Sequence, residues 1–460
     1  MASAIWKETI QSVRTCLVDR DPVAFGVCTV PAQDFGLFYG KGDTARQLHL
    51  RTASDAELEH LARACTAATF GINQQDVYDE TYRKAGKMDV EEFASKFDLE
   101  RSGILTHIKD GLLDHTNYGR PVDWELHKLN VYGSGGFFKA HKDTPRGAYM
   151  FGSLVVVFPT KHTGGELKLR HGGKEWTFDS AKELAAATEP SIGYIAFFSD
   201  VEHEVTVVQS GYRVTLTFNL YFGGTPSPSK ALNNLDINRE NAFRTRLAKL
   251  LADPKFLPKG GWIGFGLQHE YPVNANTDLR TLMERLEGSD ALVKKVGEQL
   301  SLPIQPKMMT QKGGYYVGDY YHEDDYSRKN YADDPDFLAV LTDHVVDLSK
   351  YGDALRNGVR VLKKEEGALI LPYPDGTAVK RWDAGKKKRV KCSIDIRWIT
   401  KSTLYNKVKT TYIAYNKVNI KFRGYRDFYT VGYLYGTVCF AANIGPAGKR
   451  INKSKAVPDE

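Results

Sequence analysis

The sequence lacks the segments that would direct a protein into a membrane or out of the cell. None of its 460 residues lies in a run that approaches the roughly 18 apolar residues a transmembrane helix requires. The first segment, MASAIWKETIQSVRTCL, carries charges and has no continuous apolar centre. We therefore expect neither a signal peptide nor a membrane anchor, and no membrane partner.

Cysteine is also scarce, and its five positions are scattered without a C-x-x-C pair: Cys16, Cys28, Cys65, Cys392 and Cys439. This pattern argues against a zinc finger and favours reduced thiols. We therefore expect a cytoplasmic or nuclear location. The hydrophobic fraction of 42% and the charged fraction of 26% are those of a soluble globular protein.

Acidic residues are nearly absent from one stretch near the C-terminus. Between residues 386 and 426, thirteen lysines and arginines stand against one acidic residue, Asp395. Nucleic acid is one candidate partner for this stretch, and GKKKRVK (385–391) has the form of a nuclear localisation signal. In CSIDIRWIT and VNIKFRGY, however, charged and apolar residues alternate with period two, which favours a solvated strand face. Both interpretations stay open.

The middle of the chain contains short runs of aromatic and β-branched residues separated by glycine-rich turns. These runs are LHKLNVY, GSLVVVF, GELKLRH, KEWTF, IGYIAFF, HEVTVV and YRVTLTFNLYF. Many short strands of this kind predict an antiparallel jelly roll or barrel, which we place at residues 121–224.

A chain of this length exceeds what one hydrophobic core usually serves, so further regions are expected on both sides. Residues 1–120 are expected to be mostly helical and to pack on the core, since SDAELEHLARACTAATF begins with a helix cap and continues at helical spacing. GGTPSPSKALNN (223–234) is the best candidate for a domain boundary. Residues 235–460 form the expected C-terminal α/β extension, with a degenerate second jelly roll as the alternative.

The segment FFKAHKDTPRG (137–147) places a histidine and a carboxylate at the end of a strand. Side chains at positions i and i+2 of a strand share one face, so His141 and Asp143 converge. An iron site of the facial-triad type needs two imidazoles and one carboxylate, with the remaining positions open. The third ligand has to come from a strand alongside, and FFSDVEHEV offers His203.

A single arginine stands within the apolar strand YRVTLTF, ten residues after His203. A buried guanidinium is costly unless it meets a carboxylate. A bidentate anchor for the far carboxylate of a bound keto acid would give Arg213 such a partner. Thr215 faces the same side of the strand and can donate one more hydrogen bond.

Residues 124–222 resemble the Fe(II)- and 2-oxoglutarate-dependent dioxygenases, and within them the prolyl 4-hydroxylase-like branch. The motifs that carry the resemblance are, in order, YGSGGFFKAHKD, TGGELKL, FFSDVEHEV and YRVTLTF. The flanking segments TFGINQQDVYDETYRKAGKMD and FGLQHEYPV resemble those of large fungal oxygenases of this type. The resemblance implies an α+β fold whose catalytic core is a double-stranded β-helix, or jelly roll, with N-terminal helices and a mixed C-terminal extension or second domain.

The same resemblance implies roles for the matching residues. The metal ligands, which are also the catalytic residues, are His141, Asp143 and His203. The distal carboxylate of 2-oxoglutarate is assigned to Arg213, with Thr215 and Tyr132 in support, although core packing is an alternative role for Tyr132. Fe(II) is the implied cofactor, 2-oxoglutarate and O2 are the implied co-substrates, and ascorbate is an expected stimulant.

The chain departs from its relatives at several positions. Some relatives have a second tyrosine on the strand GSLVVVF, where this chain has Val157, and Ser153 on the same strand is the expected substitute. Arg213 replaces the lysine of collagen-type prolyl hydroxylases, which weakens the assignment of proline as substrate. Asp143 argues against a halogenase, in which a small residue takes that position. Asn219 stands where nucleic-acid demethylases have a second arginine, which disfavours that activity.

Other polar residues near these motifs receive weaker assignments. Arg146 is expected to overhang the mouth of the site and contact substrate, with an ordinary surface turn as the alternative. His162 and His171 flank a Gly-Gly turn and are expected to be exposed, although either could approach the substrate. A second His-x-Asp pair, His322 and Asp324, has no suitable third ligand and is interpreted as an acidic surface loop.

The expected function is that of a dioxygenase that hydroxylates a peptidyl residue, an amino acid or a natural product. Two other classes stay open. One is a non-catalytic jelly-roll sensing module, although a metal store would need no keto-acid anchor such as Arg213. The other is a nucleic-acid-acting protein that uses the basic stretch 386–426.

Overall fold

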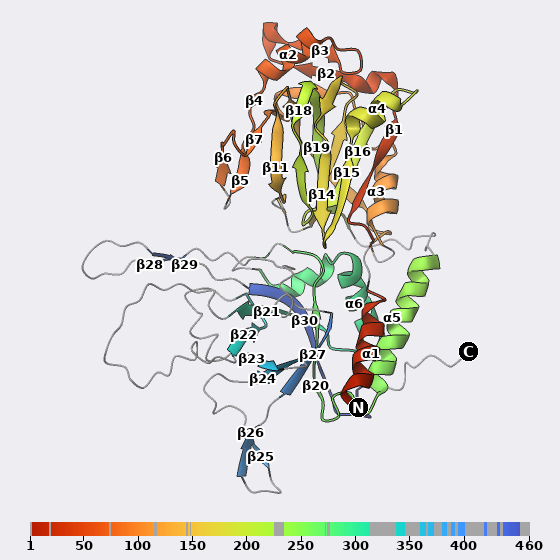
Figure 1. Ribbon diagram of the computed structural model, residues 1–460, viewed down its shortest axis with the longest axis vertical. Coiled ribbons are helices and arrows are strands. Elements are labelled where there is room, and N and C mark those ends of the chain that lie inside the picture. Colours follow the sequence, from red (N-terminus) through yellow and green to blue (C-terminus); the bar gives the residue numbers. More distant parts are fainter. Residues whose placement is uncertain are drawn as a thin grey trace, which may run out of the picture. The chain divides into compact units, whose positions relative to one another are not determined.

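The computed structural model divides the chain into two compact units, residues 19–231 and residues 1–18 with 232–460 (Figure 1). The described residues are 2–17, 20–72, 75–114, 117–143, 146–147, 149–224, 234–271, 273, 277–311, 337–345, 359–364, 367–371, 380–383, 388–391, 394–400, 418–420, 430–432 and 436–450.

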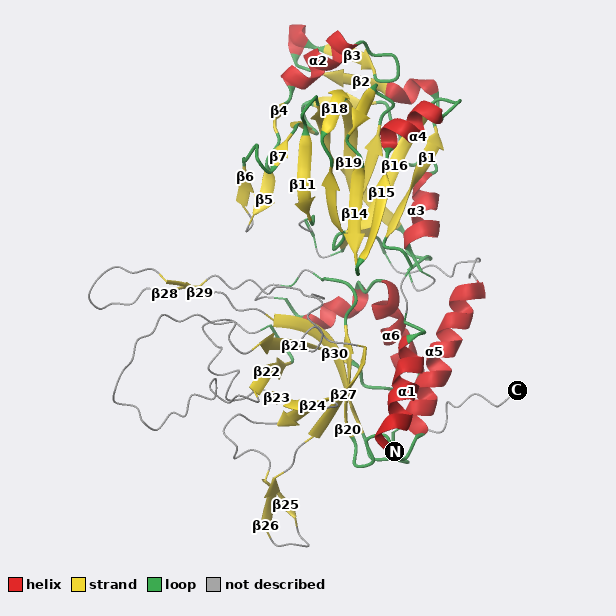
Figure 2. Cartoon of the chain, viewed as in Figure 1, coloured by secondary structure: helices red, strands yellow, loops and turns green. Residues whose placement is uncertain are grey.

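The 19–231 unit is built on two antiparallel β-sheets (Figure 2). The seven-stranded sheet has the order β1-β16-β12-β19-β10-β8-β4. Its strands are β1 (Val23–Thr29), β4 (Thr66–Ala67), β8 (Gly86–Asp89), β10 (Val122–Tyr132), β12 (Met150–Val157), β16 (Ser191–Phe198) and β19 (Arg213–Phe222). The five-stranded sheet has the order β15-β14-β17-β11-β7. Its strands are β7 (Arg83–Lys84), β11 (Phe137–His141), β14 (Leu167–His171), β15 (Lys174–Phe178) and β17 (Glu202–Val205).

Smaller elements surround these sheets. The strands are β2 (Gly36–Tyr39), β3 (Arg46–His49), β5 (Phe70–Ile72), β6 (Gln75–Val77), β9 (Phe93–Ser95), β13 (His162–Gly164) and β18 (Val208–Gly211). The helices are α2 (Asp55–Ala64), α3 (Ile104–Leu112) and α4 (Ser180–Ala186), with 3-10 turns η1 (Ala32–Phe35) and η2 (Gly42–Thr44). Helix α3 contacts β1 and β16, and α4 contacts β16 and β13.

Both sheets contribute to one hydrophobic core. Leu154 and Ile195 of the seven-stranded sheet lie in the same buried cluster as Leu169 of the five-stranded sheet. Complete burial of a side chain of this size contributes roughly 1.5–3 kcal/mol relative to exposure. The result is a mixed α/β fold with mostly antiparallel strands, which is consistent with a jelly-roll core.

Strand β19 has one polar and one apolar face, because successive side chains of a strand point to opposite sides. Its polar residues are Arg213, Thr215, Thr217 and Asn219. On the apolar face, the Phe218 ring packs edge-on against the rings of Phe97 and Trp124. On the polar side, Asn219 lies opposite Ser153 of β12, whose hydroxyl reaches Asp143 just beyond β11. The polar face is therefore directed toward the five-stranded sheet.

The expectation that residues 1–120 are mostly helical is wrong. Helix α2 is confirmed, with Ser54 as its cap, since the Ser54 hydroxyl accepts a hydrogen bond from the Glu57 N–H at 3.4 Å. The described residues of this segment, however, also form β1 to β9. Most of these strands are too short to show a period of two, and β8 takes its conformation from pairing with the distant β10.

The 1–18/232–460 unit combines helices with a closed barrel of order β20-β27-β24-β23-β22-β21-β30. The barrel strands are β20 (Gly261–Gly266), β21 (Gln305–Gln311), β22 (Phe337–Thr342), β23 (Val359–Lys364), β24 (Gly367–Leu371), β27 (Ile394–Thr400) and β30 (Gly436–Ile444). The other elements are α1 (Ala2–Arg14), α5 (Asn234–Ala252), η3 (Leu279–Glu284), α6 (Gly288–Gln299) and the hairpins β25 (Lys380–Asp383) with β26 (Lys388–Lys391) and β28 (Val418–Ile420) with β29 (Thr430–Gly432). Strands β20 and β27 pair in parallel, and the second-jelly-roll alternative stays a prediction.

The first helix belongs to this unit rather than to the core it was expected to cover. Ile10 and Val13 of α1 lie in one buried cluster with Phe243 and Leu247 of α5. The apolar residues of α1 indicate that it is buried somewhere, but the sequence alone does not show which region buries it.

Two sequence interpretations fall largely or wholly outside the described residues. Of the basic stretch 386–426, only β26, β27 and β28 are described, so the assignment of a solvated face stays a prediction. The pair His322 and Asp324 also lies outside the described residues. Within the parts of the chain that are described, no helix is both long and apolar enough to cross a membrane.

Candidate metal centre

The structure brings His141, Asp143 and His203 together at one end of the five-stranded sheet. His141 ends β11 and lies directly opposite His203 of β17 in the strand register. Each residue offers one ligand atom, and these atoms all lie within 4.8 Å of one another. His203 Nε2 is 3.7 Å from Asp143 Oδ1, and His203 is buried. Residues far apart in the chain therefore form a compact group of two imidazoles and one carboxylate.

The backbone orients both histidine rings. His141 Nδ1 lies 2.8 Å from the carbonyl oxygen of Lys139, and His203 Nδ1 lies 3.1 Å from that of Val201. A carbonyl oxygen only accepts a hydrogen bond, so Nδ1 of each ring carries the proton. Nε2 of each ring then holds the free lone pair that a metal ligand needs.

The electrostatics keep His141 and Asp143 in the protonation states that bind a metal. Burial, followed by the nearby His203, lowers the pKa of His141 to about 3, so that this imidazole stays neutral. Burial opposes ionisation of Asp143, but the two imidazoles and a hydrogen bond from Ser153 outweigh it and lower the pKa of that carboxyl. Neutral imidazoles and an ionised carboxylate are the donor set that suits Fe(II).

Ser153 has a protein partner that the sequence did not reveal, while its expected contact with the keto acid in place of a tyrosine stays a prediction. Its hydroxyl donates a hydrogen bond to Asp143 Oδ2 at 2.5 Å, from a position that is 2% exposed. Ser153 therefore orients the carboxylate of the metal centre.

Aromatic rings enclose the two histidines. The Phe138 ring stacks on His141 with 3.5 Å between centroids, and the Phe197 ring lies 4.5 Å from His203. These apolar walls hold the imidazoles in place and reduce the access of water to the ligand atoms.

Arg213 is a buried cation for which the described residues provide no counter-charge. The residue is 1% exposed, and its Nε and Nη2 atoms are buried without a hydrogen-bond partner among the described residues. Burial lowers its pKa to about 10, with only Tyr132 acting in the opposite direction. A guanidinium in this condition needs a carboxylate, so its surroundings fit the distal end of a bound 2-oxoglutarate.

The space beside Arg213 depends on a glycine. Gly165 adopts a φ of +72°, and a Cβ at this position would lie 2.9 Å from Arg213 Cδ. A larger residue would therefore be strained and would also displace the arginine side chain. The Gly-Gly turn of TGGELKL is thus required for the position of Arg213.

Tyr132 and Thr215 lie on the same face as Arg213. Tyr132 is directly opposite Arg213 in the β10–β19 register, and the guanidinium carbon lies 5.7 Å from the centre of its ring. Thr215 is 1% exposed and lies between Asn130 and Val157. Their contact with a keto acid stays a prediction that this placement allows.

The weaker candidates are placed as follows. Arg146 is exposed, three residues beyond Asp143. His162 was expected to be exposed, but it is buried, with 8% of its surface accessible, because β13 pairs with β18. Its Nδ1 lies 2.8 Å from the Thr160 carbonyl oxygen. His171, also expected to be exposed, is half-buried, and its Nδ1 lies 3.9 Å from Asp200 Oδ2.

Sequence analysis missed a polar group beside the metal centre. Arg83 Nη2 donates to Asn130 Oδ1 at 2.8 Å, and Asn130 Nδ2 donates to Thr217 Oγ1 at 3.1 Å. The Arg83 guanidinium also lies 4.3 Å from the centre of the Phe138 ring, which stacks on His141. Lys128 lies on the same strand face as Asn130 and Tyr132. The period-two spacing of these three residues in HKLNVY was the signal that could have revealed a polar face of this strand.

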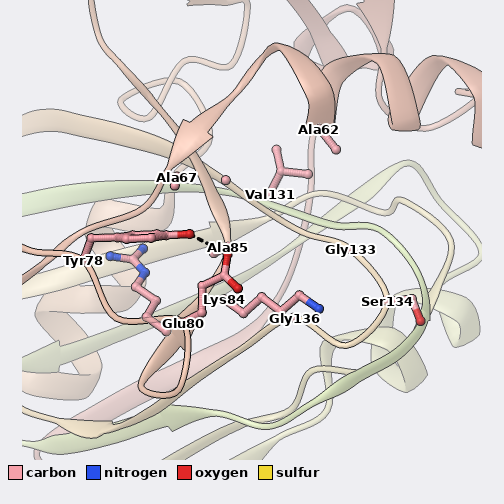
Figure 3. A pocket seen from close by; sticks show the side chains of 12 residues that line it. Ala62, Ala67, Tyr78, Glu80, Lys84, Ala85, Val131, Gly133, Ser134 and Gly136 are labelled. Carbon is pink, nitrogen blue, oxygen red and sulfur yellow. Dashed lines mark hydrogen bonds between the residues drawn. The ribbon is translucent and has the colours of Figure 1, made fainter.

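A hollow of about 210 Å³ borders this polar group, since Arg83 is one of its lining residues (Figure 3). Tyr78, Glu80, Lys84 and Ser134 are among its lining residues, and the Tyr78 hydroxyl donates to Glu80. None of the three metal-centre residues lines it, so this hollow is not the candidate metal centre.

Comparison with solved structures finds proteins that are similar to part of this chain. The chain is similar to the solved structure of a Pseudomonas putida prolyl-4-hydroxylase, at 18% identity over 47% of this chain and 100% of that one, with a TM-score of 0.29. It is also similar to a Trichoplax adhaerens prolyl hydroxylase in complex with a hypoxia inducible factor peptide fragment, at 14% identity over 48% and 90%, with a TM-score of 0.26. A viral collagen prolyl hydroxylase from Paramecium Bursaria Chlorella virus-1, in complex with 2-oxoglutarate, is similar at 13% identity over 37% and 92%, with a TM-score of 0.23. No curated protein matches the chain.

The family comparison covers the candidate site itself. Residues 127–221 match the family model of the 2OG-Fe(II) oxygenase superfamily, and this span contains the three metal-centre residues and Arg213. The family implies Fe(II), 2-oxoglutarate and O2, and the His-Asp-His group offers the ligands that could bind the iron. Over residues 127–221, therefore, the resemblance to the 2OG-Fe(II) oxygenases is confirmed.

Proposed function

We propose that the 19–231 unit is an Fe(II)- and 2-oxoglutarate-dependent dioxygenase that hydroxylates an organic or peptidyl substrate. The observation that carries the proposal is the buried, unpartnered guanidinium of Arg213 on the interior face that leads to the metal centre. A protein that only stored or sensed a metal would have no use for this costly cation. A peptidyl residue, an amino acid and a natural product are all covered by the proposal.

Each residue has a defined task in this function. The metal would be held by Nε2 of both histidines and by the Asp143 carboxylate, which Ser153 orients. Arg213 would bind the distal carboxylate of 2-oxoglutarate, with Thr215 and Tyr132 along the same face. When bound, Fe(II) with 2-oxoglutarate and O2 supplies the oxidant for a C–H bond, with release of succinate and CO2. The apolar walls of the site limit water and so protect that chemistry.

The test is succinate release from 2-oxoglutarate by the full-length chain with Fe(II) and ascorbate, together with Mn(II)-dependent binding of 2-oxoglutarate. We expect both in the wild type, loss of both with a chelator, and recovery of both when metal is restored. Arg170→Ala is a matched control for Arg213→Ala, because Arg170 is partly exposed and already paired with Glu175 and Glu204. A wild-type chain that neither binds 2-oxoglutarate nor releases succinate would overturn the proposal.

The same assays separate the two rival classes. Binding of metal and 2-oxoglutarate without any succinate release would favour the sensing module. Nucleic-acid binding that falls steeply with salt and depends on the basic stretch 386–426 would favour a nucleic-acid-acting protein.

A further inference from the structure

Lys128 lies on the interior face of the seven-stranded sheet, at the end where the metal centre is found. In register it stands opposite Thr217 of β19, and Thr217 stands opposite Val155 of β12. Val155 is two residues from Ser153, which contacts the metal-centre carboxylate. A bulge between Leu126 and Lys128 shifts the register of β10 at this point. That shift places Lys128, Asn130 and Tyr132 on the face that carries Arg213.

The amine of Lys128 has no partner in the part of the chain that the structure describes. Among the described residues, none makes a hydrogen bond or an ion pair with it, although the side chain is half-buried. Asp89 stands opposite Lys128 in the β8–β10 pair, but its carboxylate is taken by Lys87 at 3.0 Å. Burial, followed by the charges of Arg83, Arg146 and Lys87, lowers the pKa of Lys128 to about 8, against the opposing charge of Asp143.

The charge balance of the site leaves this amine in excess. Fe(II) and Arg213 together carry as much positive charge as Asp143 and 2-oxoglutarate carry negative charge. Lys128, Arg83 and Arg146 are then three further cations near a filled site. Arg83 already donates to the Thr69 carbonyl oxygen and to Asn130, and Arg146 is exposed to solvent. Lys128 is therefore the half-buried cation whose amine has no partner among the described residues. A negative group on an incoming substrate would be attracted to it.

We propose that Lys128 binds a carboxylate of the primary substrate, so that the substrate is a carboxylic acid held beside the metal centre. The inference rests on the proposed function and specifies its substrate class. A single ammonium group is a compact point charge that matches a singly charged carboxylate. A phosphate would require several donors, and both terminal nitrogens of the neighbouring Arg83 already donate within the protein.

The experiment uses the full-length chain loaded with Mn(II) and 2-oxoglutarate, with 13C-labelled acetate and benzoate and the matching amides as probes. Broadening of the 13C signals by Mn(II) reports binding close to the metal. We expect the acids to bind at least about tenfold more tightly than the amides, the effect of one charge-assisted contact. Lys128→Met should remove this difference and Lys128→Arg should preserve it. Lys174→Gln is the control, since Lys174 is an exposed lysine paired with Asp21.

Two outcomes would overturn the inference in a wild type that releases succinate. One is equal binding of acids and amides, and the other is an acid preference that survives in Lys128→Met. A wild type without succinate release or 2-oxoglutarate binding would instead overturn the proposed function, and this inference with it. A second measurement, of succinate release with added compounds, identifies the source of the carboxylate. Stimulation by free L-amino acids would show that Lys128 binds an α-carboxylate. Stimulation by end-blocked peptides containing Asp or Glu would show that it binds a side-chain carboxylate.

Discussion

Ser153→Ala isolates the contact that orients the metal-centre carboxylate. The Ser153 hydroxyl donates to Asp143 Oδ2 at 2.5 Å from a position that is 2% exposed, so water cannot easily replace it. Loss of a hydrogen bond to a charged group costs roughly 1.5–3 kcal/mol. Removal of a group that orients a metal ligand typically weakens metal binding by about 10- to 100-fold. We therefore expect the Kd for Fe(II) to rise by that factor while the protein stays folded.

The assay is an anaerobic Fe(II) titration of wild type and variant, with urea unfolding of the metal-free proteins as a check on folding. Ser191→Ala is the control, because Ser191 is equally buried but its hydroxyl donates to the Glu189 carbonyl oxygen, away from the centre. An unchanged Kd for Fe(II) with a raised KM for 2-oxoglutarate would refute the reasoning. It would return Ser153 to the role of co-substrate contact that the sequence predicted.

Three further predictions concern the same unit. Alanine at any of the three metal-centre positions (His141→Ala, Asp143→Ala or His203→Ala) should abolish both iron binding and succinate release, because no other described side chain completes this ligand group. Wild-type iron content in any of them would contradict this. Arg213→Ala should raise the KM for 2-oxoglutarate through the loss of roughly 2–5 kcal/mol, and Arg213→Lys should be milder, whereas an unchanged KM in Arg213→Ala would point to another anchor. The metal-free protein should lose stability as the pH falls from 6.5 toward 4, because burial lowers the pKa of His127 to about 4 from its ordinary 6.5 and the unfolded state then binds more protons in this window. Urea unfolding should show a shallower loss for His127→Gln, and an equally steep loss would exclude His127 as a source.

Three long strands of the seven-stranded sheet could be predicted because each is long enough to show its pattern. LHKLNVY, IGYIAFF and YRVTLTFNLYF lie in β10, β16 and β19. The arginine within YRVTLTF stood out because a charge in an apolar strand needs an explanation. The i, i+2 spacing of His141 and Asp143 predicted that their side chains converge. The segment FFSDVEHEV, farther along the chain, supplied His203 as the third ligand.

The remaining contacts depend on how distant strands are aligned. The hydrogen bond from Ser153 to Asp143 and the pairing of Lys128 with Thr217 follow from the register of β10, β12 and β19 and from the bulge before Lys128. A shift of one residue would turn these side chains to the opposite face, and no local pattern fixes such a register. His162 was misjudged for the same reason, since the pairing of β13 with β18 buries it.

The division of the chain into units has a consequence for its synthesis. Helix α1 is made first, but Phe243 and Leu247, which bury its apolar face, are made only after the whole 19–231 unit. A helix of 13 residues is marginally stable in water by itself. During translation, Ile10 and Val13 are therefore left without their packing partners and are open to chaperones, while the 19–231 unit can already fold on the ribosome. The candidate metal centre can thus form before the other unit is complete, because the segments of that unit precede and follow it in the chain.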